Sequence, residues 1–220
     1  MKKFFYTACT LTLFALTLTN DHLFGQQTTA GASASSHASQ VSTPIQEPPA
    51  GLVKIFGNLG PKTSAFTSGG WFVVGPKHSG GRQFVGLPFS PKANSTVTQV
   101  QAAVQYNASG ANQVNLSVYT DNGGAPGTLI GGPVTITNLS NCCVCCTLTI
   151  GSFSPGVHVV AGAKYWLVAD TPASGTGSDF LGVWNWTPPT TTRFGLNHTG
   201  WVSSGAVLQE PAGALYGTVP

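Results

Sequence analysis

Charged side chains are scarce in this sequence of 220 residues. Aspartate, glutamate, lysine and arginine together make up 7% of it, compared with about 25% in ordinary globular domains. The formal net charge is only +3, and the basic residues form no cluster along the chain. Because nucleic-acid binding depends on a concentrated basic surface, the composition argues against nucleic-acid partners. It argues equally against an electrostatic membrane patch.

Carboxylates and catalytic motifs are also rare. From Gly51 onward the acidic residues are Asp121, Asp170, Asp179 and Glu210. A glycosidase needs two carboxylates that face each other across the substrate, and Asp170 with Asp179, which flank one loop, could do so. The sequence has no nucleophile elbow, no zinc-protease motif and no phosphate-binding loop. We therefore expect a protein that is not an enzyme, with a small polysaccharide hydrolase or lyase as a less favoured alternative.

A long apolar run is missing except near the amino terminus. Residues 4–19 are mostly apolar and follow a basic start, a pattern too short for a spanning helix but typical of a signal peptide. We place the cleavage near Gly25, so that residues 1–25 are the signal peptide. Residues 26–50 are small, polar and aperiodic, and are predicted to be a disordered linker. The mature chain is expected to be secreted or held at the cell surface, without a membrane span.

The remaining residues, 51–220, are predicted to form one all-β domain. In residues 96–106 valines and alanines alternate with glutamines, and residues 113–119 repeat the pattern. This period of two is typical of strands that pack on one face and contact water on the other. Many further short runs follow, separated by some of the 28 glycines and 15 prolines. The expected fold is an antiparallel two-sheet β-sandwich, jelly-roll-like in architecture.

Several segments of this domain resemble a known family. They are residues 89–104, residues 115–130, a Cys-Cys segment, residues 161–170 and residues 178–186. The most specific part is a pattern within 115–130, to which the strand at 161–166 adds, and it consists of Leu116, Tyr119, Asp121, Gly123, Pro126 and Gly127. Through them the region 83–220 resembles the choice-of-anchor domains of bacterial exported proteins, the R type in particular. The resemblance implies an extracellular jelly-roll-like sandwich, often followed by a short anchoring tail, and it supplies no catalytic residues. Because no such tail follows here, we expect plain secretion more than surface attachment.

Four cysteines lie within five residues: Cys142, Cys143, Cys145 and Cys146. In an exported protein an even set of cysteines first indicates disulfide bonds. On a straight strand Cys143 and Cys145 would lie about 6.6 Å apart, barely within the usual range, whereas adjacent cysteines lie closer than usual. Local turns, vicinal bridges or bonds between chains must therefore be involved. A thiolate metal site, which one crowded segment suits poorly, and a redox-active site are the alternatives.

Two tryptophans are the main candidates for ligand binding. Trp184 and Trp186 are two positions apart, so on a strand they point to the same face, about 6.6 Å from each other. If that face is exposed, the rings form a platform for sugars, and Asp179 and Asn185 lie near enough in sequence to bond hydroxyl groups. The interpretation that we favour is that one or both tryptophans fill the core.

Asp121 and Asn122 are candidate calcium ligands, because carboxylate and carbonyl oxygens suit that ion. The segment lacks the run of alternating aspartates and the bidentate glutamate of a dedicated calcium loop. A hairpin turn, in which both side chains bond their own backbone and Gly123 and Gly124 adopt positive φ, is the preferred interpretation. Apart from calcium, we expect no cofactor.

The function expected from the sequence is a non-catalytic, secreted or cell-surface module with a structural or adhesive role. Extracellular polysaccharide or surface proteins are the expected partners. The alternative is a carbohydrate-binding module that uses the two tryptophans, with calcium as a candidate for assisting it.

Overall fold

The computed structural model describes residues 43–44, 47–48, 50–79, 81–188, 195–197, 200–203 and 209–220. The predicted signal peptide and most of the predicted linker lie outside these residues. The described part of the chain is all-β, with 14 strands in three antiparallel sheets, which confirms the predicted fold class. Within the same residues, no helix is long and apolar enough to cross a membrane.

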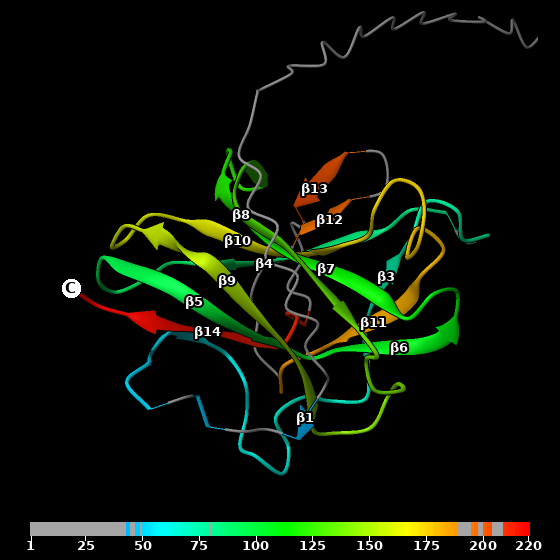
Figure 1. The fold of residues 1–220 in the computed structure, drawn as a ribbon, viewed down its shortest axis with the longest axis horizontal. Coiled ribbons are helices and arrows are strands. Elements are labelled where there is room, and N and C mark those ends of the chain that lie inside the picture. Colours follow the sequence, from blue (N-terminus) through cyan, green and yellow to red (C-terminus); the bar gives the residue numbers. More distant parts are fainter. Residues whose placement is uncertain are drawn as a thin grey trace, which may run out of the picture. The chain divides into compact units, whose positions relative to one another are not determined.

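Five strands form the first sheet, in the order β1-β9-β5-β14-β2 (Figure 1). Their bounds are β1 Thr43–Pro44, β9 Thr147–Val159, β5 Ser95–Ala102, β14 Gly213–Thr218 and β2 Val53–Gly57. At one edge Thr43 and Pro44 pair with Leu148 and Thr147. A short part of the predicted linker therefore joins the sheet.

Six strands form the second sheet, in the order β13-β12-β4-β10-β7-β8. Their bounds are β13 Trp201–Ser203, β12 Gly195–Asn197, β4 Phe84–Phe89, β10 Tyr165–Asp170, β7 Gln113–Asp121 and β8 Pro126–Thr137. The core lies between the first two sheets, where side chains such as Val100, Leu215, Leu116 and Leu167 are fully buried. Close packing of these inner faces makes the described domain a β-sandwich.

The third sheet extends the sandwich and has three strands, β3 (Gly70–Val74), β11 (Leu181–Asn185) and β6 (Val104–Ser109). One strand was predicted at 96–106, but the chain leaves the first sheet after Ala102 and enters the third at Val104. Between them, the Ala103 amide donates to the Ala212 carbonyl and the Ala103 carbonyl accepts from the Asn185 amide. These two bonds, one to the residue before β14 and one to the last residue of β11, hold the crossing point.

The prediction that the polar faces of these strands contact water is wrong. Gln101, Gln105, Asn115 and Ser117 are all buried. The Gln105 amide donates to the Val144 carbonyl at 2.8 Å, and Asn115 accepts from the Thr135 hydroxyl at 2.9 Å. Because buried polar groups must find partners, the alternation here separates an apolar inner layer from a hydrogen-bonded outer layer.

Candidate functional site

Trp184 belongs to the core, as the favoured interpretation predicts. Its side chain is fully buried, and its indole N–H donates to the Ala212 carbonyl at 2.8 Å. Trp186 is half-buried, and its ring lies against Trp71, with 5.6 Å between ring centroids, and against Gly69, where a Cβ would stand 2.3 Å from the indole. An exposed pair of sugar-stacking rings is therefore not formed here.

The two polar residues proposed to assist these tryptophans lie in different environments. Asn185 is fully buried, which keeps its amide away from a ligand in solvent. The exposed Asp179 carboxylate accepts from the Ala111 amide at 3.1 Å, in the loop that precedes β7. The structure thus does not gather Asp179, Trp184, Asn185 and Trp186 on one open face.

The Asp121–Gly124 segment is a hairpin turn between β7 and β8. One Asp121 carboxylate oxygen accepts from the Gly124 amide at 3.1 Å, and the other from the Trp166 indole at 2.7 Å. The Asn122 amide donates to the Ala125 carbonyl, and Gly123 and Gly124 have positive φ, as the turn prediction requires. No group of three acidic, histidine or cysteine side chains in the described residues could hold a metal ion.

The cysteine segment contains two vicinal disulfides, Cys142–Cys143 and Cys145–Cys146, one of the arrangements left open by the sequence. Val144 between them is exposed, while its carbonyl holds Gln105 of β6. The sulfur of Cys146 accepts from the Ala65 amide at 3.3 Å. Through these contacts the cysteine segment packs on the third sheet and binds the loop of residues 58–69, which connects β2 to β3.

Asp170 and Asp179, the pair considered for hydrolysis, have different partners. Asp170 ends β10 opposite Asn115, and burial raises the pKa of its carboxyl to about 7, although hydrogen bonds from Asn115 and Tyr119 and the charge of Arg82 act the other way. Burial, followed by the charge of Asp170, raises the pKa of Tyr119 to about 12. Since Asp179 is held by Ala111, these contacts give the hydrolase alternative no support.

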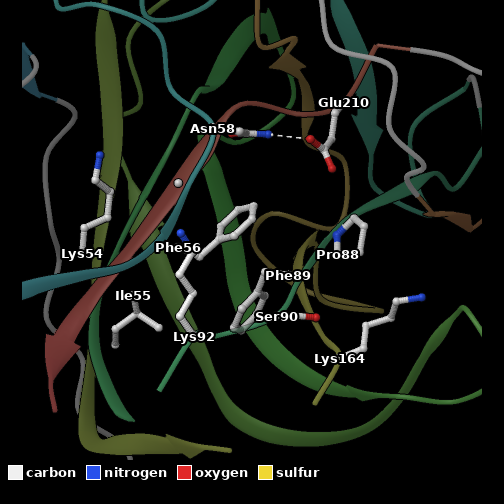
Figure 2. Close-up of a pocket in the computed structure, with 11 residues that line it drawn as sticks. Lys54, Ile55, Phe56, Asn58, Pro88, Phe89, Ser90, Lys92, Lys164 and Glu210 are labelled. Atoms are coloured by element: carbon white, nitrogen blue, oxygen red, sulfur yellow. Dashed lines mark hydrogen bonds between the residues drawn. The ribbon is translucent and has the colours of Figure 1, made fainter. Parts of the chain in front are cut away.

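A pocket of about 840 Å³ lies where β2 approaches the ends of β4 and β10 (Figure 2). Its walls come from residues 54–58, residues 88–90, Lys92, Lys164 and Glu210. One wall belongs to the first sheet and the other to the second. The pocket therefore lies between the two sheets, beside the edge strand β2, and its volume falls within the usual range for small-ligand sites.

A β-bulge in β2 shapes one wall of this pocket. Lys54 pairs with Tyr216 and Phe56 pairs with Leu215, so that Ile55 is an extra residue in the strand. A bulge redirects the side chains around it. As a result Lys54, Ile55 and Phe56 all line the pocket, although strict alternation would send successive side chains to opposite faces.

Aromatic rings form the floor of the pocket and connect its two walls. The ring centroids of Phe56 and Phe89 are 5.8 Å apart, and Phe89 stacks on Tyr165 at 5.6 Å. Phe89 and Tyr165 are buried, and the Tyr165 hydroxyl accepts from the Val160 amide. Phe56 is the half-buried end of this row. The firmly packed neighbours fix its ring in place.

Lysines surround the rings. Six lysine and arginine residues lie in the described part of the chain, and three of them, Lys54, Lys92 and Lys164, line this pocket. All three are exposed. In Figure 2, Lys54 and Lys164 lie on opposite sides of the two phenylalanine rings, and Lys92 lies beside Phe56. Half of the described cationic groups therefore gather at one place on a weakly charged chain.

Asn58 and Glu210 close one end of the pocket. The Asn58 side-chain amide donates to the Glu210 carboxylate and to the Pro211 carbonyl, both at 2.9 Å, and its oxygen accepts from the Gly213 amide at 2.8 Å. Glu210 is buried. These bonds hold the segment that enters β14 against the end of β2, and they orient the carboxylate within the pocket wall.

Replacing Asn58 with alanine is expected to lower the free energy of unfolding by about 2–3 kcal/mol. The substitution removes three hydrogen bonds and leaves the buried Glu210 carboxylate with one donor fewer. Urea denaturation measures the change. Asn107→Ala, at an exposed position in β6, is the matched control and should change stability by less than about 0.5 kcal/mol. An equal effect of the two substitutions would contradict the role given to Asn58.

Comparison of the chain with protein-family models finds no match, and comparison with curated proteins finds none. The resemblance to choice-of-anchor domains stays a prediction. The function is therefore inferred from the chemistry of the pocket.

Proposed function

We propose that this protein is a non-catalytic β-sandwich module with an adhesive role, secreted or held at the cell surface, and that the pocket around Phe56 is its adhesive site. The observation that carries this proposal is a fixed, partly exposed aromatic ring among exposed lysines. Binding sites characteristically combine an apolar surface with a few placed polar groups. Because two sheets hold the ring, it can contact a ligand with little loss of side-chain freedom.

The chemistry of the pocket favours binding over catalysis. Glu210 is the carboxylate among the lining residues, and it is buried and bonded to Asn58. Hydrolysis of a glycosidic bond ordinarily uses two carboxyl groups on either side of the bond. The pocket has an aromatic ring flanked by lysines and a single carboxylate that is already hydrogen-bonded to Asn58. This arrangement supports binding of a ligand rather than its cleavage.

Carbohydrate is the ligand class that we favour for this site. A flat ring such as Phe56 can pack against the apolar face of a sugar, while Ser90 and the lysines offer hydrogen-bonding groups around it. The carbohydrate-binding alternative drawn from the sequence is thus retained, but moved from Trp184 and Trp186 to Phe56. Surface proteins are the competing partners.

Replacing Phe56 with leucine is expected to weaken retention on the bound polysaccharide at least about tenfold. Leucine keeps an apolar side chain at the position but removes the flat ring and its contact with Phe89. The measurement is depletion of the purified chain by a panel of insoluble polysaccharides and binding to a glycan array, after circular dichroism has shown that the variant is folded.

Phe72→Leu is the control, because Phe72 is an exposed phenylalanine of the third sheet and lies outside the pocket lining. It should bind as the unaltered protein does. Equal retention of the Phe56 and Phe72 variants would contradict the placement of the site, and retention on surface proteins alone would exclude carbohydrate as the ligand.

A further inference from the structure

The three lysines of the pocket come from segments far apart in the sequence. Lys54 is in β2, Lys92 follows β4, and Lys164 directly precedes β10. The fold therefore brings them together, and it does so on a chain in which only 7% of residues are charged. Like charges around one concave surface create a positive potential that attracts anions.

In the described residues, these lysines have no ion pair with a carboxylate of the protein. The salt bridge that the structure describes joins Lys62 to Glu47 at 3.1 Å, away from the pocket lining. Glu210, the acidic group of the lining, is buried and bonded to Asn58. The positive charge at the pocket thus exceeds the negative charge and is directed to the solvent.

The arrangement of the lysines suits a ligand with several anionic groups. Lys54 and Lys164 lie on opposite sides of the phenylalanine rings (Figure 2). A ligand that binds both lysines therefore has to extend across the apolar floor of the pocket, which one small anion does not do. A chain of acidic sugars meets both requirements. Its ring faces can pack on Phe56, and its repeated acidic groups can reach lysines on either side.

Lysine suits the binding of the carboxylate and sulfate groups of acidic sugars. Its ammonium is a compact charge that can approach a carboxylate or a sulfate from many directions, whereas arginine provides the planar, two-pronged recognition common at phosphates. No arginine lines the described pocket. A nucleic acid would need a longer basic surface than three lysines supply. The charge pattern therefore favours an acidic polysaccharide over a nucleic acid.

We infer that the pocket binds acidic polysaccharide, with Phe56 holding a sugar ring and Lys54, Lys92 and Lys164 binding carboxylate or sulfate groups along the sugar chain. This inference rests on the proposed function and specifies its ligand. It assigns a role to the lysines that a neutral-sugar site would not require.

The test compares matched charged and uncharged polymers by calorimetry or biolayer interferometry. Polygalacturonate is compared with its methyl ester, and dextran sulfate with dextran, so that the two pairs distinguish carboxylate from sulfate. The protein should bind at least one charged polymer about tenfold or more tightly than its uncharged match. Added salt should weaken that binding, because it screens the lysines.

Two double variants with the same change in charge make the test specific to the pocket. Lys92→Gln with Lys164→Gln should weaken binding of the charged polymer at least about tenfold. Lys62→Gln with Lys77→Gln removes two exposed lysines outside the pocket lining and should change binding less than about twofold. Equal losses in the two variants would overturn the inference, since the attraction would then be a property of net charge.

The outcomes also separate this inference from the proposed function. Equal binding of charged and uncharged polymers, lost in Phe56→Leu, would overturn the acidic ligand but keep a carbohydrate-binding site. Binding of polyglutamate as tight as that of the acidic polymers, with the same lysine dependence, would overturn the polysaccharide in favour of an acidic protein. Binding to none of these polymers would contradict both.

Discussion

Replacing Trp184 with alanine is expected to lower the free energy of unfolding by about 3–5 kcal/mol, the range for large aromatic side chains removed from a core. The Trp184 side chain is fully buried, lies in register with Trp71 of β3 and Val104 of β6, and bonds the Ala212 carbonyl. Because domains are stable by only about 5–15 kcal/mol in total, a large part of this stability would be lost. Urea denaturation with an unchanged slope would give the value.

Two further variants separate the apolar and the polar parts of this effect. Trp184→Phe keeps most of the apolar volume but removes the indole donor, so that the Ala212 carbonyl keeps only its bond from the Ala103 amide, and we expect an intermediate loss of about 1–3 kcal/mol. Phe72→Ala, at an exposed position in the same sheet, should cost less than about 1 kcal/mol. A Trp184→Ala protein that stays as stable as the original but loses sugar binding would restore the tryptophan platform and contradict the core assignment.

The second large effect is expected at Asp170. Burial raises the pKa of this carboxyl from 3.8 to about 7 in the folded chain, so the folded protein binds a proton that the unfolded chain releases. The stability that this proton contributes is fully present below about pH 4 and is lost as the pH rises through about 7. Above that pH, the folded state has to keep a poorly hydrated carboxylate.

Asp170→Asn should therefore stabilise the protein above pH 7 and have little effect near pH 4. We expect the free energy of unfolding to rise by about 1–3 kcal/mol at pH 8. This is less than the full pKa shift of Asp170 would give, because the side chain is only half-buried and solvent screens part of its charge. The measurement is the difference in free energy of unfolding between variant and original at pH 4, 6 and 8, which cancels the titration of other groups. A difference independent of pH would contradict the assignment.

The fold class could be predicted because many short apolar runs between turn residues leave few alternatives to a sandwich. The burial of the glutamines could not be predicted. Gln105 and Gln101 alternate with apolar residues as solvent-facing side chains do, but segments distant in sequence cover them. The Val144 carbonyl that bonds Gln105 is 39 residues away, and no local pattern indicates such a contact. The break at Ala103 depends likewise on Ala212 and Asn185.

The pocket was missed for the same physical reason. Phe56 and Lys54 share a wall only because Ile55 forms a bulge, which is set by the pairing with β14 near the end of the chain. Lys92 follows β4 and Lys164 directly precedes β10, and in a chain with so few charges their positions are a usable signal. The sequence favours the tryptophans over Phe56 as ligand-binding candidates, because aromatic residues serve both cores and binding sites.

The most direct test of the account is a crystal structure of the chain with a short oligogalacturonate bound. A sugar ring should lie against Phe56, with the carboxylates of the oligogalacturonate near Lys92 and Lys164 or near Lys54. Sugar bound against Trp186, or on another face with the pocket open and unoccupied, would contradict it.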